Sequence, residues 1–217
     1  MEQAESTVFV VDDDEAVCRS LKRLLRALGW KVEAFASAEQ FLTAPRPRSP
    51  ACLVLDLELP GRTGLELQEA LRSSAIDLPV VFITGHGDIP IAVRAMRAGA
   101  ISFLLKPLIE RDLLDAIEEA LASSSERANR AQERAEVCRR IECLTPRQLQ
   151  VMRLVIRGML NKQIAAALHI AEKTVKVHRS RMMQVMQVDS VAELVRLAAK
   201  AEPGLESSVA VGAACHS

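Results

Sequence analysis

The sequence contains no long uninterrupted apolar segment, which argues against a membrane-spanning protein. A transmembrane helix needs about 20 predominantly apolar residues, and even a run of about 18 is missing from the 217-residue chain. The first residues are acidic and lack the basic segment that opens a secretory signal. We therefore expect a cytoplasmic protein with no membrane partner.

Cysteine pairs at metal-binding or redox spacing are also missing. The chain has five cysteines, an odd number, and none forms a C-x-x-C pair. We therefore interpret them as reduced thiols, with a disulfide or a zinc site as the minor alternative.

A net charge is absent as well, but this net charge of zero conceals an asymmetry along the chain. Residues 1–122 contain 19 acidic and 13 basic side chains, whereas residues 123–217 contain 9 acidic and 15 basic ones. Halves of opposite sign indicate two domains with different partners. The basic half is suited to nucleic acid.

The acidic half alternates short apolar runs with amphipathic segments. Such alternation predicts an α/β fold, a doubly wound five-stranded parallel sheet with helices on both faces. The last helix of this half is expected to end near residue 121. The expected strands are residues 7–11, 31–35, 51–55, 80–83 and 101–105.

Polar side chains stand at the ends of four of these strands. Asp12 and Asp13 follow the first, Asp56 ends the third, Thr84 ends the fourth and Lys106 follows the fifth. Any one of them can be structural, and a lone strand-end Asp is more often a turn or capping residue. Their joint occurrence indicates a site, because ligands bind outside the carboxyl ends of parallel strands.

These residue types are suited to phosphoryl chemistry. Clustered carboxylates repel one another, and a hard cation such as Mg²⁺ relieves the repulsion. A metal-bound carboxylate, here Asp56, can attack phosphorus. The Lys106 ammonium and the Thr84 hydroxyl can then neutralise the phosphoryl oxygens.

Residues 7–122 resemble the receiver domain of two-component response regulators, whose fold is CheY-like. The resemblance rests on Val-Val-Asp-Asp-Asp at 10–14, Asp56 with Pro60-Gly61, Thr84-Gly85 and Lys106-Pro107. The string Ile-Thr-Gly-His-Gly-Asp at 83–88 is similar to the FixJ-like group within that family.

This resemblance implies a role for each residue of the cluster. Asp56 would accept the phosphoryl group from a sensor histidine kinase, and Lys106 and Thr84 would contact it. The Mg²⁺ ligands would be Asp12, Asp13, Asp56 and the backbone carbonyl of Glu58. Thr84 would form the switch with Phe103. Because Phe103 has no hydroxyl, only the burial of its ring could report the phosphorylation state. Plain core packing of Phe103 is the equal alternative.

The segment 122–143 contains neither glycine nor proline and is rich in Ala, Arg, Gln and Glu. It predicts a largely helical, semi-rigid linker that continues from the last helix of the acidic half. A flexible coil through the three serines at 123–125 is the alternative.

The basic half predicts four short helices. Thr145 followed by Pro146 is a helix start, and Asn161 and Ser190 are expected to cap two further helices. Between these two, a tight turn precedes a basic helix over residues 172–186, which is the helix-turn-helix pattern. Residues 202–217 are expected to be a disordered tail.

This half resembles the LuxR/NarL-type helix-turn-helix domain. The matching strings are Leu-Thr-Pro-Arg-Gln at 144–148, Asn-Lys-Gln-Ile-Ala at 161–165 and Lys-Thr-Val-Lys-Val-His at 173–178. The resemblance implies that bases of double-stranded promoter DNA are read by Lys176, Val177 and Ser180. The phosphate contacts would come from Asn161, Lys173, Thr174 and Arg179.

Together these features predict a response regulator and not an enzyme. Its parts would be a receiver at 1–121, a helical linker at 122–143, a helix-turn-helix domain at 144–201 and the tail. Phosphorylation would favour a homodimer through residues 89–103 and regulate transcription, as an activator. The alternatives are a regulator that works without phosphorylation and, far less favoured, a dehalogenase-like phosphatase, which carries its nucleophile on the first strand.

Overall fold

A computed structural model describes residues 6–45, 50–74 and 76–201, so the expected tail lies outside the described residues. The chain divides into two compact units, Met1–Ala128 and Asn129–Ser217. In the part of the chain that the structure describes, we find no helix long and apolar enough to cross a membrane.

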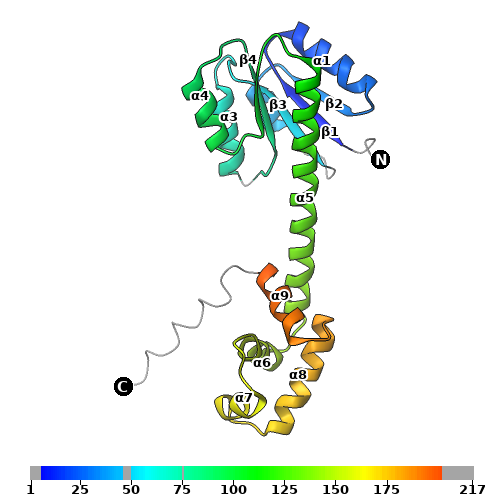
Figure 1. The fold of residues 1–217 in the computed structure, drawn as a ribbon, viewed down its shortest axis with the longest axis vertical. Coiled ribbons are helices and arrows are strands. Elements are labelled where there is room, and N and C mark those ends of the chain that lie inside the picture. The colour runs from blue at the N-terminus through cyan, green and yellow to red at the C-terminus, as the bar shows by residue number, and fades with distance from the viewer. Residues whose placement is uncertain (1–5, 46–49, 75, 202–217) are drawn as a thin grey trace. The chain divides into compact units, whose positions relative to one another are not determined.

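The first unit contains a five-stranded sheet in which all neighbouring strands are parallel (Figure 1). The strand order is β2-β1-β3-β4-β5, a doubly wound arrangement. The predicted fold class is confirmed. The strands are β1 (Thr7–Val11), β2 (Lys31–Phe35), β3 (Ala51–Asp56), β4 (Val80–Thr84) and β5 (Ser102–Leu105).

Helices cover both faces of this sheet and enclose a core on each. Alternate residues of a strand point to opposite faces, so Val8 and Phe9 lie in different cores. One core lies under α1 (Glu15–Ala27) and α5 (Glu110–Glu142). The other lies under α2 (Ala38–Thr43), α3 (Gly64–Ser73) and α4 (Ile89–Arg97), and Figure 1 shows α3 and α4 on the side away from α5.

Helix α5 extends well past residue 121, where its apolar pattern weakens, and residues 123–125 lie inside it. Two side-chain contacts hold its continuation within the first unit. Ser124 Oγ accepts a hydrogen bond from the backbone N–H of Ala51 at 3.1 Å. Arg127 forms an ion pair with Asp77, which precedes β4.

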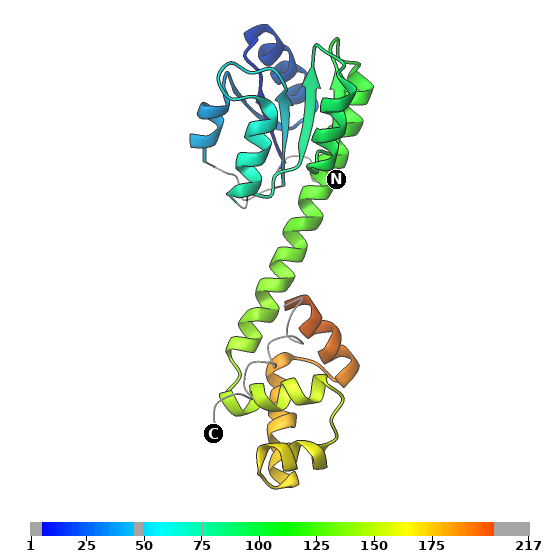
Figure 2. The same cartoon turned by 90° about the vertical axis from the view of Figure 1, so that its left-hand side faces the viewer.

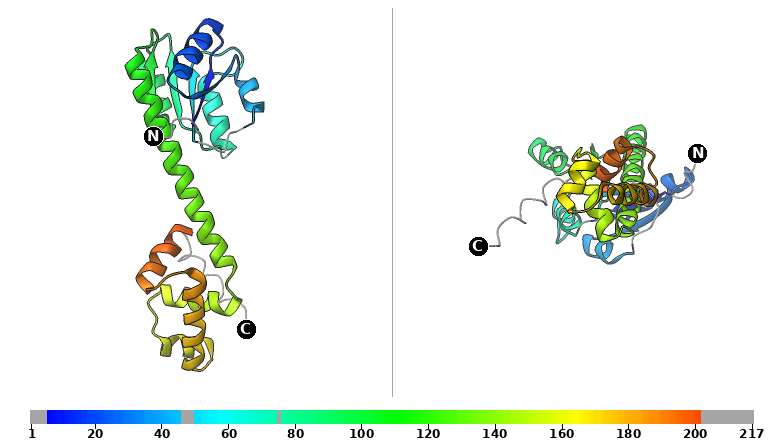
Figure 3. Two further views of the ribbon diagram at one scale, coloured as in Figure 1. Left: turned by 90° about the vertical axis from the view of Figure 1, so that its right-hand side faces the viewer. Right: turned by 90° about the horizontal axis from the view of Figure 1, so that it is seen from below.

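The second unit is helical and contains α6 (Pro146–Ile156), α7 (Asn161–Leu168), α8 (Glu172–Met186) and α9 (Val191–Ala201). Helix α8 packs against α6 and α7, as Figure 2 and Figure 3 show. The predicted separate helix-turn-helix fold is therefore present.

The last turns of α5 also belong to this unit. Val137 is 3% exposed and lies in the same core as α6 and α8. Arg134 donates to the carbonyl of Ala201, and Arg140 donates to the carbonyl of Met186. These bonds satisfy carbonyls at the ends of α9 and α8, where intrahelical donors run out. The second compact unit thus includes residues that the sequence alone assigns to the linker.

Two of the three expected helix caps are present. The Thr145 hydroxyl accepts from the Gln148 N–H at 3.3 Å, and the Ser190 hydroxyl accepts from the Glu193 N–H at 3.2 Å. The expected cap by Asn161 is wrong, because Leu160 occupies the N-cap position and Asn161 is the first helical residue. Its side chain is engaged elsewhere, since Asn161 Oδ1 accepts from Arg179 Nη1 at 2.9 Å.

Candidate functional site

Lys106 links two buried carboxylates at the carboxyl edge of the sheet. Its Nζ donates to Asp12 Oδ2 at 2.7 Å and to Asp56 Oδ2 at 2.6 Å. Asp12 is fully buried and Asp56 is 5% exposed. The predicted proximity of these residues arises because β1, β3 and β5 are parallel and end on the same side.

Asp13 completes an acidic cluster beside this pair. Carboxylate oxygens of Asp12, Asp13 and Asp56 lie within 4.8 Å of one another. Such an all-oxygen set, with one exposed member, fits a hard divalent cation that keeps part of its water shell. The Glu58 N–H donates to Asp56 Oδ1 at 3.1 Å, which fixes the loop that would supply a backbone carbonyl to that cation.

The electrostatics of the cluster follow from burial and from the shared ammonium. Burial raises the pKa of Asp12, although hydrogen bonds from Lys106 and from the Asp14 N–H oppose the rise. For Lys106, burial lowers the pKa, but the hydrogen bonds to Asp12 and Asp56 outweigh it and leave the pKa raised. The ammonium therefore stays charged at neutral pH and offsets the repulsion between the carboxylates.

Thr84 is buried at the end of β4, and its hydroxyl faces its own loop. Thr84 Oγ1 accepts from the His86 N–H at 3.2 Å and donates to the His86 carbonyl at 3.3 Å. Phe103 lies opposite Phe82 in the β4–β5 register, with 6.3 Å between the ring centroids, and is half-buried. A hydroxyl in a loop turn and a half-buried ring are both able to rearrange.

Two further features of the site escape sequence reasoning. His86 Nδ1 lies 2.8 Å from Glu58 Oε1, and both side chains are exposed. A signal existed, because each residue follows a strand-end site residue, Asp56 or Thr84, by two positions. Gly64 begins α3 where a Cβ atom would stand 2.4 Å from the carbonyl oxygen of Asp56.

Helix α8 presents a polar face in the second unit. Lys173, Lys176, Val177 and Ser180 are exposed and follow the i, i+3, i+4, i+7 spacing of one helix face. Val175, Met182 and Met186 lie on the buried side. Thr174 is also exposed, and Arg179 is half-buried through its bond to Asn161. An exposed face of this kind has the form of a helix that enters the major groove.

Comparisons with known proteins match both units. The response regulator receiver domain family matches residues 8–118, and the family of bacterial regulatory proteins, luxR family, matches residues 142–198. Nodulation protein W of Bradyrhizobium diazoefficiens is 45% identical over 193 residues, which cover 89% of this chain and 85% of that protein. The response regulator protein TmoT of Ectopseudomonas mendocina is 42% identical over 206 residues, 95% of this chain and 94% of that one.

Solved structures of similar proteins span both units as well. A structure of the response regulator StyR is 51% identical and covers 91% of this chain and 100% of its own, with a TM-score of 0.80. Full-length FixJ from B. japonicum is 37% identical and covers 90% of this chain and 96% of its own, with a TM-score of 0.53.

Proposed function

Since the chain belongs to the two-component response regulators, with a receiver domain and a LuxR-type DNA-binding domain, we propose that phosphorylation of Asp56 controls its binding to DNA. Proteins of this family are regulators and not enzymes. The observation that supports the proposal is the Asp56 carboxylate, buried at the end of β3 and bonded to Lys106 beside Asp12 and Asp13.

The donor would be a phosphohistidine of a sensor histidine kinase. An Asp56 carboxylate oxygen attacks phosphorus, the P–N bond breaks, and the departing imidazole retains the electron pair and takes up a proton. Asp12, Asp13, Asp56 and the Glu58 carbonyl would hold Mg²⁺, which neutralises charge on the phosphoryl oxygens. Lys106, whose Nζ bonds Asp56 Oδ2 at 2.6 Å, would contact those oxygens as well.

The switch would begin at Thr84. Its hydroxyl exchanges its bonds to His86 for a phosphoryl oxygen, and the loop after β4 moves with it. The Phe103 ring then changes its burial beside this loop, which alters the surface of α4 and β5.

That surface offers a place for a homodimer. Large apolar side chains are exposed on and beside α4 and β5, which is unusual unless a partner covers them. Ile89 is 75% exposed and Leu105 is 54% exposed, and the others are Val93, Met96 and Ile109. Dimerisation presents two α8 helices to two half-sites and multiplies the affinity of each.

In the DNA complex, Lys176, Val177 and Ser180 would contact base edges in the major groove. Asn161, Lys173, Thr174 and Arg179 would contact phosphates, which position the protein without specifying sequence. We assign the protein to the cytoplasm, where promoter DNA and the kinase are accessible, and to transcriptional activation.

The decisive experiment incubates the protein with acetyl phosphate and Mg²⁺ and measures both the added phosphoryl group and DNA affinity. The wild type should gain one phosphoryl group and bind promoter DNA more tightly, and Asp56→Asn should do neither. Labelling of Asp56→Asn to the wild-type extent would refute the acceptor assignment. If the phosphodonor left the DNA affinity of the wild type unchanged, the alternative of a phosphorylation-independent regulator would be favoured.

A further inference from the structure

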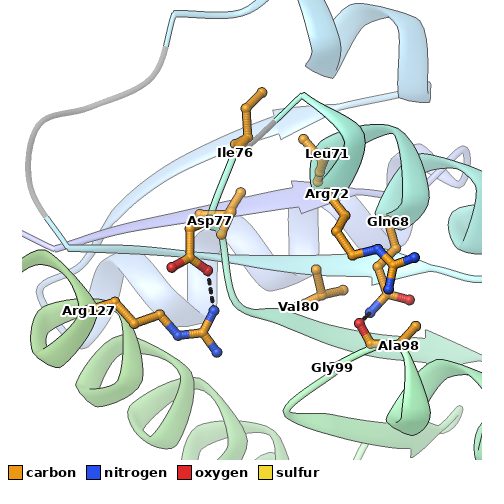
Figure 4. Close-up of a pocket in the computed structure, with 10 residues that line it drawn as sticks. Gln68, Leu71, Arg72, Ile76, Asp77, Val80, Ala98, Gly99 and Arg127 are labelled. Carbon is orange, nitrogen blue, oxygen red and sulfur yellow. Dashed lines mark hydrogen bonds and ion pairs between the residues drawn. The ribbon is translucent and has the colours of Figure 1, made fainter. Parts of the chain in front are cut away.

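The first unit contains a pocket at the opposite end of the sheet from Asp56. It has a volume of about 320 Å³ and surrounds Val80, the first residue of β4. The end of α3, the turn after α4 and the α5 residue Arg127 form its walls (Figure 4). This volume is at the lower limit for small-molecule sites.

Positive charge predominates in the lining. Arg72 of α3 and Arg127 of α5 contribute guanidinium groups from two sides, and Asp77 contributes the one carboxylate of the pocket lining. Figure 4 shows the Arg127–Asp77 pair on one side of Val80 and Arg72 on the other. The partner of Arg72 is Glu69, in an exposed pair that contributes little to stability. Arg72 can therefore turn to another anion at small cost.

Gln68 lies in the same lining with an incomplete set of hydrogen bonds. The residue is 6% exposed, and its Nε2 makes a long bond of 3.5 Å to the Ala98 carbonyl. Its Oε1 is buried and has no partner within the described residues. A buried acceptor without a donor is costly and uncommon. A carboxylate cannot donate to it, so the donor would have to come from an arginine that the ligand draws inward.

Apart from Ala98 and Gly99, the rest of the lining consists of apolar side chains, the buried Leu71 and Val80 and the half-buried Ile76 and Leu78. An inorganic anion such as phosphate would leave this surface uncovered. A carboxylate on a short apolar body would satisfy both parts, because guanidinium groups bind carboxylates in a bidentate manner and the hydrocarbon would leave water.

We propose that this pocket binds a small organic carboxylate, held by Arg72 and Arg127 with its apolar body over Ile76 and Leu78. The ligand would replace Asp77 as the partner of Arg127. Because Arg127 and Ser124 hold the continuation of α5 in the first unit, the ligand would loosen one of the two contacts there. The site is separate from Asp56 and does not depend on phosphorylation.

The test uses the full chain and calorimetric titration with straight-chain monocarboxylates from butanoate to octanoate. We expect affinity to increase with chain length, and we expect the matching primary amides and inorganic phosphate to bind at least about tenfold more weakly. Equal binding of phosphate, or no heat with any carboxylate at concentrations of about 10 mM, would overturn the proposal.

Two variants give opposite expected signs. Arg72→Gln should weaken binding about tenfold, whereas Asp77→Asn should strengthen it, because Arg127 loses its competing partner. If Asp77 only stabilised the pocket, Asp77→Asn would weaken binding instead. That result would refute the proposed placement of the ligand against Arg127. Arg111→Gln, which removes an exposed arginine of α5 that pairs with Asp115 and does not line the pocket, is the control for loss of a positive charge and should bind as the wild type does. Asp56→Asn should also bind normally, which separates this site from the phosphorylation proposal.

Discussion

His86 Nδ1 lies 2.8 Å from Glu58 Oε1, so that one side-chain pair joins the loops after β3 and β4 at the rim of the Asp56 site. Each residue stands two positions beyond a site residue, Asp56 or Thr84. Water that hydrolyses a phosphorylated Asp56 must approach from this exposed edge, because β3 is buried along its whole length.

We therefore predict that His86→Ala and Glu58→Ala each shorten the lifetime of phosphorylated Asp56. The effect should be a few-fold at most, because an exposed pair contributes up to about 1 kcal/mol. The measurement is the rate of phosphoryl loss after removal of the phosphodonor. Since both substitutions break one pair, the double variant should lose the group no faster than either single variant; additive effects would show that the residues act separately.

Lys106→Met should destabilise the protein in the absence of divalent cations. The substitution leaves the buried carboxylates of Asp12 and Asp56 without their shared cation. Loss of one partner from a buried pair costs about 3–5 kcal/mol, and we expect about 2 kcal/mol because the Lys106 side chain is 24% exposed. Urea unfolding in EDTA measures the loss.

Added Mg²⁺ should recover part of that stability, because the cation replaces the missing positive charge. Lys31→Met, which removes an exposed lysine of the same unit, should behave as the wild type in both conditions. If Lys106→Met were as stable as the wild type in EDTA, the carboxylates would need no counter-charge.

Gly64→Ala should disturb the acceptor site directly. The new Cβ atom would lie 2.4 Å from the Asp56 carbonyl oxygen and 3.1 Å from the Phe82 ring, so the start of α3 must shift. Overpacking of this kind costs about 1–3 kcal/mol, and the rate of phosphorylation by acetyl phosphate should fall. Gly85→Ala is the control beside the same site, since its added Cβ would meet no atom within 4 Å apart from its chain neighbours; equal effects of the two variants would contradict the steric explanation.

The strand-end residues of the site could be predicted from the sequence for a simple reason. Parallel strands end at one edge, so Asp12, Asp56 and Lys106 meet wherever the pattern of strands is identified correctly. The Glu58–His86 pair was not accessible in this way, because loop conformation decides which exposed side chains touch. Asn161 shows the same limit, since an arginine eighteen residues away takes the side chain that local pattern assigns to a cap.

The end of α5 and the Arg127 pocket depend on contacts between distant segments. No glycine or proline stops α5 after residue 121, and its weak apolar stripe gives no endpoint. Val137 packs in the second unit, whereas Ser124 and Arg127 make contacts in the first. These contacts decide to which unit each part of the helix belongs.

This assignment predicts that Val137→Ala destabilises the second unit. Val137 is 3% exposed in the core that contains Met152 and Met186, and loss of two buried methyl groups should cost about 2 kcal/mol. Urea unfolding and promoter binding of the full chain are the measurements. Ala135→Ser, at an exposed position of the same helix, should change neither. A fragment from residue 129 should also be more stable than one from residue 144; equal stability would place residues 129–143 outside the folded domain.

The capping boxes at the starts of α3 and α6 predict different responses to acid. In α3, Glu66 Oε2 accepts from the Thr63 backbone N–H at 2.8 Å and from the Thr63 hydroxyl at 2.9 Å. The first of these bonds, followed by the second, lowers the pKa of Glu66. In α6, the amide of Gln148 fills the same position and accepts from the Thr145 N–H at 2.8 Å, but it does not titrate.

A carboxylate whose pKa is lower in the folded than in the unfolded protein stabilises the fold above its unfolded pKa, and this contribution is lost as the pH falls through the folded value. The first turn of α3 should therefore loosen as the pH falls below the usual pKa of a Glu carboxyl, about 4.3, while the first turn of α6 should not. NMR titration of the Glu66 carboxyl carbon and amide protection in both turns measure the difference. Thr63→Ala removes the hydroxyl donor and should return the pKa part of the way to its usual range. A Glu66 pKa at or above that range in the wild type would contradict the prediction, because the two hydrogen bonds would then contribute nothing to the charged form.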